Sequence, residues 1–532
     1  MKFLIQQHGF LPECWKKEFN VVMDKIVVLD FGSQYSHLIC RRIRDSNVYC
    51  ELLPYNSPLS LIKNLEPKGI VLSGGPSSVY LQGSPKPDKQ IFDMGIPVLG
   101  ICYGHQLIVD EFKGKIKRFD NREYGYADLV IDDNSDLFKG INKKIKCWMS
   151  HADAAEDIPN NFKILAHTDN SFSAAIANRD KKFYGIQFHP EVSHTEQGNR
   201  ILRNFSQSIS NAKPDWTMQN FIDFTIKEIK RKVQDDKVLC AISGGIDSTT
   251  LAVLLNKAIG NKLICVFVNN GLLRLNEEEL VPKLINKYLG INTVCINAEE
   301  RFLSRLEGIG DPEQKRKIIG EEFAQVFLQV TRDYGPFQWL AQGTLYPDVI
   351  ESGFSKGPAA VIKTHHNVGG LPQWLNLKVL EPFRSLYKDE VRQIAVLLDI
   401  PNEFIKRHPF PGPGLAVRII GEITAEKIRI VRHASSIVES ELMISGWYDK
   451  VWQAYAAVGD DLAVGVLGDE RVYGHIVTIR IIESLDAMTA DWSRIPYDLI
   501  SKISNRITNE VNGVTWVNYS VSSKPPATIE PQ

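Results

Sequence analysis

Continuous apolar runs that end in glycine turns constrain the fold of this chain more than any other feature of its sequence. Residues 25–35 (KIVVLDFGSQY), 69–76 (GIVLSGGP) and 96–112 (IPVLGICYGHQLIVDEF) each begin as such a run, and the third passes directly into a helical pattern. Strands that are apolar on both faces and alternate with helices are typical of a parallel sheet with helices on both sides. Strands at 145–149 and 183–188 are expected to extend this sheet.

The same pattern returns later in the chain. Residues 236–260 (DKVLCAISGGIDSTTLAVLLNKAIG) predict a strand, a glycine loop and a helix that begins at Thr249, and further strands are expected at 262–271 and 292–297. Beyond residue 407 a proline-rich loop leads into strands expected at 463–466 and 476–482. We therefore expect an α/β chain with two doubly wound, mostly parallel-sheet domains, followed by a smaller α+β C-terminal domain.

The length of 532 residues accommodates three domains. Residues 1–22 contain an apolar stretch that is too short and interrupted for a signal sequence, and no run is long enough to span a bilayer. The expected organisation is an N-terminal extension at 1–22, one doubly wound domain at 23–210, a second at 211–407 and the C-terminal α+β domain at 408–532.

Charge and cysteine usage exclude several classes of protein. The chain has 62 Lys and Arg against 63 Asp and Glu, a net charge of −1, which argues against nucleic acid as a partner because a nucleic-acid binder carries a basic face. Its eight cysteines include no CxxC pair, so neither a disulfide framework nor a zinc ribbon is expected. These features predict a cytoplasmic protein with no membrane partner.

Cys102 lies between an apolar strand and a helix and is flanked by Gly100 and Gly104. Small neighbours allow a sharp strand-to-helix turn from which a nucleophile projects, and a helix N-terminus lowers the pKa of a thiol. The run FHPEV offers His189 as a proton shuttle and Glu191 as the group that fixes the imidazole tautomer. A buried core thiol or a turn histidine explains each residue alone, but together at two strand ends they predict a nucleophilic triad.

The segments GICYGHQ and GIQFHPEV around these residues resemble the nucleophile and His/Glu motifs of class I glutamine amidotransferases. The resemblance implies that Cys102 attacks the side-chain amide of glutamine, forms a γ-glutamyl thioester and releases ammonia. The loop at 72–76 looks like the oxyanion loop of this family. The implied oxyanion residues are Gly74, Gly75 and the backbone N–H of Tyr103.

The segment SGGIDS at 243–248 joins a strand to a helix. Backbone N–H groups of a glycine loop at a helix N-terminus form a phosphate cradle, and no Lys-Ser/Thr follows at the spacing of a Walker A loop. A lone Gly-Gly turn is more often structural. Ser243, Asp247 and Ser248 favour the anion site because they add hydroxyl donors and a carboxylate suited to Mg²⁺.

SGGIDS resembles the pyrophosphate loop of N-type ATP pyrophosphatases, which cleave ATP between its α- and β-phosphates and adenylylate a carbonyl oxygen. The resemblance implies Mg²⁺ bound with ATP, with Asp247 as a ligand and Asp348 as a further metal or nucleotide contact. An amidotransferase joined to such a domain suggests that ammonia made in one is consumed in the other. The implied ATP and pyrophosphate contacts are Ser243, Gly244, Gly245, Ile246, Asp247, Ser248, Thr249 and Lys363.

Five further segments, at 311–323, 340–352, 362–372, 407–422 and 524–530, resemble the family of glutamine-hydrolysing GMP synthetases. The implied reaction converts XMP, ATP, glutamine and water to GMP, AMP, pyrophosphate and glutamate. The resemblance also implies a homodimer formed through the C-terminal domain. The positions that match XMP contacts of the family are Arg316, on a mobile lid segment, and Gln453, Lys524, Ile529 and Glu530, with Lys524 at the 5′-phosphate.

The chain departs from these families at a few positions. His105 stands where amidotransferases usually have Met, and Ala152 replaces the usual Gly of a His-Gly-Asp motif. Asn269 stands where the GMP synthetase family has Asp, and Pro531-Gln532 stand where it usually has Trp-Glu. None of these changes touches the triad.

Two alternatives remain open. One is an amidotransferase–pyrophosphatase that aminates another carbonyl, as in the NAD or thiolated-tRNA branches, and the segments PFPGPG and KPPATIE argue against it. The other is a catalytically silent nucleotide-binding regulator. The intact Cys102, His189, Glu191 and SGGIDS argue against that second alternative.

Overall fold

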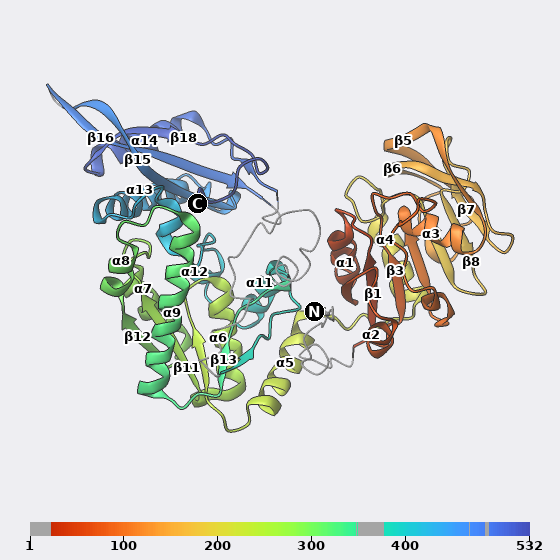
Figure 1. The fold of residues 1–532 in the computed structure, drawn as a ribbon, viewed down its shortest axis with the longest axis horizontal. Coiled ribbons are helices and arrows are strands. Elements are labelled where there is room, and N and C mark those ends of the chain that lie inside the picture. The colour runs from red at the N-terminus through yellow and green to blue at the C-terminus, as the bar shows by residue number, and fades with distance from the viewer. Residues whose placement is uncertain (1–22, 347, 349–376, 468, 485–488) are drawn as a thin grey trace, which may run out of the picture. The chain divides into compact units, whose positions relative to one another are not determined.

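The computed structural model describes residues 23–346, 348, 377–467, 469–484 and 489–532. The expected extension at 1–22 lies outside this range. The chain forms two compact units, Met1–Phe221 and Ile222–Gln532, which Figure 1 colours from red to yellow and from yellow-green to blue.

The first unit contains a nine-stranded sheet with the order β2-β1-β3-β4-β9-β8-β7-β5-β6. The first five strands in this order run parallel, and the remaining pairs are antiparallel. The expected parallel core is therefore confirmed, with an antiparallel extension. The strands are β1 Lys25–Asp30, β2 Tyr49–Pro54, β3 Gly69–Leu72, β4 Val98–Ile101, β5 Lys115–Ile131, β6 Lys144–Asp157, β7 Lys163–His167, β8 Ala175–Asn178 and β9 Phe183–Ile186.

Helix α3, Tyr103–Glu111, packs against β3, β4 and β9 and is buried from Tyr103 to Val109. Two glycines permit this close approach. A Cβ on Gly100 would overlap the backbone of Gly104, and a Cβ on Gly104 would overlap the backbone of Leu72. The other helices of this unit are α1 Ser36–Arg44, α2 Leu59–Asn64 and α4 Gly198–Arg203, which continues as a π-helix over Asn204–Ile209.

The second unit begins with a parallel five-stranded sheet of order β12-β11-β10-β13-β14. Helix α6 begins at Ile246 with Gly245 as its N-cap, so the expected start at Thr249 was wrong by three residues. The strands are β10 Val238–Ala241, β11 Leu263–Asn269, β12 Thr293–Asn297, β13 Trp339–Ala341 and β14 Lys378–Leu380, and the helices are α5 Met218–Val233, α6 Ile246–Ile259, α7 Glu277–Leu289, α8 Glu299–Leu306, α9 Pro312–Tyr334, α11 Lys388–Leu397 and α12 Asn402–Ile405.

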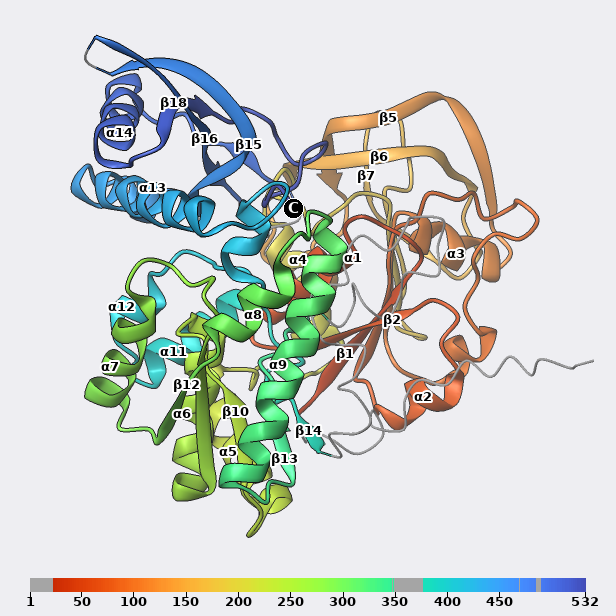
Figure 2. The ribbon, with the colours of Figure 1, turned by 60° about the vertical axis from the view of Figure 1, so that its left-hand side comes forward.

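The end of the second unit is a small α+β assembly. A long hairpin of β15 Gln453–Leu467 and β16 Glu470–Glu483 pairs with β17 Asp491–Trp492 and β18 Val514–Tyr519. Helix α13, Ala425–Ile444, packs on β15, and α14, Tyr497–Glu510, packs on α13 and β18 (Figure 2). One apolar core joins this assembly to the five-stranded sheet.

No helix in the described part of the chain is long and apolar enough to cross a membrane.

Candidate functional site

Cys102 occupies a sharp turn between β4 and α3. Its backbone has φ 53° and ψ −104°, a conformation that side chains other than glycine rarely adopt, and its N–H donates to the carbonyl of Ile186 over 2.8 Å. Cys102 is the N-cap of α3 and is 6% exposed. Such strain is kept where the surrounding structure fixes it, and here it places Cys102 at the N-terminus of a helix, the positive end of the helix dipole.

His189 and Glu191 follow β9 and lie together in the core. Nδ1 of His189 is 2.7 Å from Oε1 of Glu191, and Glu191 is fully buried. The hydroxyl of Thr195 donates to the carbonyl of His189 over 2.6 Å, and Arg42 donates to the carbonyl of Glu191 over 3.0 Å. These bonds hold both residues in place.

Burial opposes protonation of His189, but Glu191 and the Cys102 thiol outweigh it and raise the pKa of His189 well above its ordinary value. The imidazolium that forms when the ring takes a proton from the thiol is therefore stabilised. Because Nδ1 faces Glu191, Nε2 is the nitrogen left to exchange a proton with sulfur.

Gly74 lies beside both predicted catalytic groups. A Cβ at this position would stand 3.2 Å from Cε1 of His189 and 3.7 Å from Cβ of Cys102. A Cβ on Gly75 would stand 2.8 Å from the carbonyl of Phe31, so close packing requires a glycine there. Tyr103, the first residue of α3, presents an N–H that has no partner within a regular helix. The structure thus brings together Cys102, His189, Glu191, the loop glycines and the Tyr103 amide.

Gln187 is a neighbour of the thiol that the sequence analysis did not identify. Its Nε2 lies 3.7 Å from Sγ of Cys102, and its Oε1 accepts from Nε2 of Gln106 over 3.4 Å. Gln187 precedes His189 by two residues, so the two-residue period of an extended chain was the signal that could have identified it.

His105 lies fully buried in α3, one turn from Cys102, and neither of its ring nitrogens makes a hydrogen bond of ordinary geometry within the described residues. Burial, together with the nearby His151, lowers the pKa of His105 to about 3. The folded chain therefore keeps this imidazole neutral, whereas the unfolded chain protonates it below about pH 6.5. Stability is lost as the pH falls from about 6.5 towards 3.

His105→Met is expected to remove this loss. When the pH falls from 7.5 to 5, the unfolding free energy of wild type should drop by about 2 kcal/mol more than that of the variant. The reason is that His105 binds a proton only in the unfolded chain. Urea unfolding at both pH values measures the difference, and exposed His433→Met serves as the control. If the unfolding free energies of variant and wild type differed by the same amount at both pH values, His105 would not be the group that binds the proton on unfolding.

The SGGIDS loop lies between β10 and α6. The Ser248 hydroxyl accepts from the Ser243 N–H over 3.2 Å and lies 3.0 Å from the Ser243 hydroxyl, which in turn accepts from the Gly245 N–H over 3.3 Å. Gly244 has φ +74°, which favours glycine. Ile246 and Thr249 are buried, so their side chains anchor the helix start rather than lining the loop.

Asp247 sits in the first turn of α6. Its Oδ1 is buried without a hydrogen-bond partner in the described part of the chain, and its Oδ2 lies 3.4 Å from Nζ of Lys388. Arg407 donates to the carbonyl of Gly244 over 3.0 Å. Lys388 and Arg407 stand at least 140 residues along the chain from the loop, and no local pattern could have assigned them to it.

The remaining predicted ATP and metal residues are Asp348 and Lys363. Asp348 accepts from the N–H of Leu345 over 2.9 Å, and Lys363 lies outside the described residues. No group of three or more His, Cys, Asp or Glu side chains that could hold a metal ion occurs among the residues that the structure describes.

The predicted XMP contacts lie around the last residues of the chain. Glu530 accepts from Nε2 of Gln453 over 2.7 Å, and Arg418 forms a two-pronged pair with the same carboxylate at 3.0 and 3.1 Å. Lys524 pairs through its backbone with Ala490. Arg316, on α9, bonds Glu313 over 2.7 Å.

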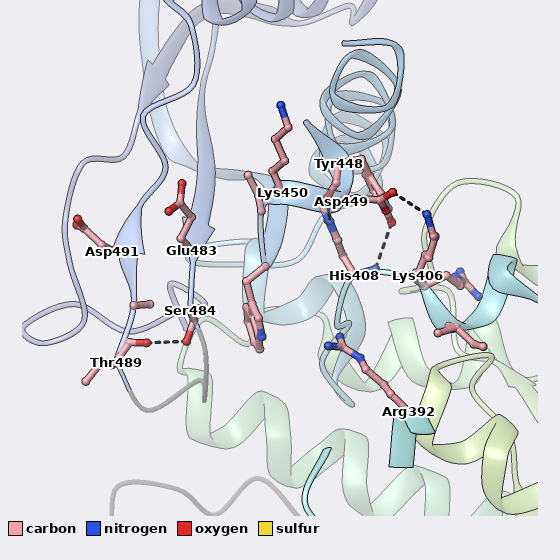
Figure 3. A pocket seen from close by; sticks show the side chains of 15 residues that line it. Arg392, Lys406, His408, Tyr448, Asp449, Lys450, Glu483, Ser484, Thr489 and Asp491 are labelled. Atoms are coloured by element: carbon pink, nitrogen blue, oxygen red, sulfur yellow. Dashed lines mark hydrogen bonds and ion pairs between the residues drawn. The ribbon is translucent and has the colours of Figure 1, made fainter. Parts of the chain in front are cut away.

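A cavity of about 860 Å³ lies in the second unit near these residues (Figure 3). Its lining includes Arg407, which bonds the SGGIDS loop, and Ala490, which pairs with Lys524. Four basic side chains line it, those of Arg392, Lys406, Arg407 and Lys450. None of the predicted site residues lines it.

Comparison with known proteins identifies the family of the chain. Residues 27–208 match the family described as glutamine amidotransferase class-I, and residues 440–531 match the GMP synthase C terminal domain. The GMP synthase (glutamine-hydrolyzing) of Caldanaerobacter subterraneus subsp. tengcongensis is 52% identical over 511 residues, covering 96% of this chain and 99% of that protein.

Proteins with the same name from other organisms are similarly close. The one from Synechococcus sp. is 52% identical over 514 residues, covering 95% of this chain and 96% of its own length. The one from Clostridium novyi is 51% identical over 505 residues, covering 95% of this chain and 98% of its own length. The chain therefore belongs to the family of glutamine-hydrolysing GMP synthases, and it is an enzyme of that family.

Proposed function

We propose that Cys102, His189 and Glu191 release ammonia from glutamine. His189 takes the thiol proton at Nε2, and the thiolate attacks the side-chain amide carbon. The proton then passes to the departing nitrogen, ammonia leaves, and water hydrolyses the thioester to glutamate. The 2.7 Å bond between His189 and Glu191, beside a strained and helix-capping Cys102, is the observation that carries this proposal.

The oxyanion formed in this reaction needs nearby donors. Gly74 and Gly75 in the loop after β3, with the N–H of Tyr103, are the proposed donors, because the loop lies directly beside Cys102 and His189. The glycines leave room for the substrate amide at this point.

The second reaction is proposed to take place at the SGGIDS loop. The O2 atom of XMP attacks the α-phosphate of ATP, pyrophosphate leaves, and ammonia then displaces AMP at C2 to give GMP. The loop residues Ser243, Gly244, Gly245 and Ser248 are proposed to hold the pyrophosphate at the N-terminus of α6. Lys388 adds a cation, and Lys363 is a further proposed phosphate contact.

Asp247 suits a magnesium ion that arrives with ATP. Its Oδ1 is a buried carboxylate oxygen with no hydrogen-bond partner among the described residues, and Mg²⁺ is commonly held by one or two carboxylates together with substrate phosphates. When bound, the ion supplies charge neutralisation for the phosphates. Asp348 is the other proposed ligand.

The proposed XMP site is formed by Arg316, Gln453, Lys524, Ile529 and Glu530. Lys524 would meet the 5′-phosphate as a point charge.

The test of this function is pyrophosphate release. Purified full-length chain with Mg-ATP and ammonium should release pyrophosphate in proportion to GMP when XMP is added. Equal release with the carbonyl substrates of the NAD or thiolated-tRNA branches, or none with XMP, would overturn the proposal.

We further propose a cytoplasmic homodimer. The seven described cysteines are free thiols, as expected in a reducing compartment. The distal half of the β15–β16 hairpin exposes Leu462, Val464, Val466 and Tyr473, with Val464 paired directly to Tyr473. This apolar sheet face suits a second copy of the chain, because a two-fold interface buries the same patch on both subunits.

Val466→Asp is expected to weaken the dimer by at least about 100-fold, since a two-fold interface would bury the new charge twice. Val466 is 73% exposed in the single chain, so the variant should fold. Sedimentation velocity measures the shift to monomer, with Val396→Asp on α11, 60% exposed, as the matched control. A wild-type chain that sediments as a monomer would contradict the homodimer.

A further inference from the structure

The last five residues, Thr528–Gln532, are called here the tail segment. Buried side chains of the C-terminal sheet fix its backbone. Arg480 donates to the carbonyls of Thr528 and Ile529 over 2.8 and 2.9 Å, and the Tyr455 hydroxyl donates to Ile529 over 2.5 Å. Two of the proposed XMP contacts, Ile529 and Glu530, belong to this segment.

The Glu530 carboxylate is also fixed before any ligand arrives. Its partner Arg418 is 1% exposed, and the guanidinium lies 4.4 Å from the ring centre of Tyr455 and 5.0 Å from that of Phe410. Gln453 donates to both Glu530 and the carbonyl of Pro409, which sets the orientation of its amide. One end of the tail segment is therefore held by the sheet itself.

The other end is held by helix α9. Lys315 is fully buried, and its Nζ donates to Oε1 of Gln532 over 2.6 Å and to the carbonyl of Ile419 over 2.7 Å. Burial and the nearby Lys427 lower the pKa of Lys315 to about 8, against the opposing pull of Asp460 and Asp311. A buried lysine whose bonds go to neutral oxygens is costly to keep, and its strongest side-chain contact is to the tail.

We propose that Lys315 and Gln532 are positioning residues for the XMP site. Their contact ties α9, which carries Arg316, to the tail segment, which carries Ile529 and Glu530. The inference rests on the proposed assignment of those three residues to XMP. Neither Lys315 nor Gln532 touches the substrate; they set the distance between the two groups that do.

Losing the contact would leave the two elements to be ordered by the ligand. The free energy needed to order α9 and the tail segment would then weaken XMP binding equally in the ground state and in the transition state. KM for XMP should therefore rise while kcat at saturation stays the same. Losing one hydrogen bond from a charged donor corresponds to a rise in KM for XMP of about tenfold or more.

The experiment compares Gln532→Ala with Gln314→Ala in the full-length enzyme, because Gln314 is an exposed glutamine beside Lys315 on α9. Gln532→Ala is expected to raise KM for XMP about tenfold, with kcat, KM for ATP and basal glutamine hydrolysis unchanged. Gln532→Glu, which offers the ammonium a carboxylate, should restore KM. Lys315→Met should raise KM for XMP by a smaller factor in the Gln532→Ala variant than it does in the wild-type enzyme.

Equal KM values for XMP in Gln532→Ala and Gln314→Ala would overturn the inference. So would a parallel loss of ATP affinity and thermal stability in Gln532→Ala, because that result indicates general loosening. A wild-type enzyme that makes no GMP from XMP would instead contradict the proposed function, and the inference would fall with it.

Discussion

Replacing Cys102 by alanine is expected to lower glutamine-dependent GMP formation by at least about a thousandfold, because the variant lacks the thiol on which the proposed thioester forms. Synthesis from XMP, ATP and ammonium salt should remain close to that of wild type, since the second reaction needs only ammonia. Steady-state rates with each nitrogen source measure both effects in one preparation.

Cys295→Ala is the matched control, because Cys295 is exposed and lies in the second unit. Both nitrogen sources should support wild-type rates in this variant. Loss of ammonia-dependent synthesis in Cys102→Ala would contradict the division of the chemistry into two sites.

Asp247→Asn should lower GMP formation by about a hundredfold or more with either nitrogen source, since it removes the carboxylate proposed to hold Mg²⁺ and leaves Lys388 without its partner. Basal glutamine hydrolysis should not change. XMP-dependent pyrophosphate release measures the loss directly.

Asp235→Asn provides the comparison for this variant. Asp235 is a fully exposed carboxylate paired with Lys262, before β10, and its substitution should leave synthesis unchanged. If Asp247→Asn retained most of its synthetic rate, the proposed role of this carboxylate would be wrong.

Some of the parallel strands were predictable because they are apolar on both faces and lead into a glycine turn. Strands β1, β3, β4 and β10 follow this pattern closely. The long antiparallel strands β5 and β6 were not fully predictable, since β5 was not expected and β6 extends eight residues beyond the expected strand at 145–149. Their pairing is set by tertiary contacts.

Parts of the candidate site were predictable for a related reason. Cys102, His189 and Glu191 lie in short motifs at strand ends, where local sequence determines which groups converge. Lys388 and Arg418, in contrast, meet their partners through long-range packing. Only the folded chain shows those contacts.

Asn269, which departs from the family, has a local physical explanation. Its Oδ1 accepts from the Gly271 N–H over 3.0 Å, and its Nδ2 lies 3.3 Å from the Glu299 carboxylate. An aspartate here would place two like charges together, whereas the amide satisfies both neighbours.

The most direct test of whether amide cleavage is coupled to nucleotide amination is to trace the amide nitrogen of glutamine into GMP. Full-length enzyme is given XMP, Mg-ATP and glutamine labelled with ¹⁵N at its amide, in the presence of unlabelled ammonium, and the GMP is examined by mass spectrometry. We predict that the exocyclic amino group of GMP carries the label, with one AMP and one pyrophosphate formed per GMP. Unlabelled GMP, or no GMP at all, would contradict the account.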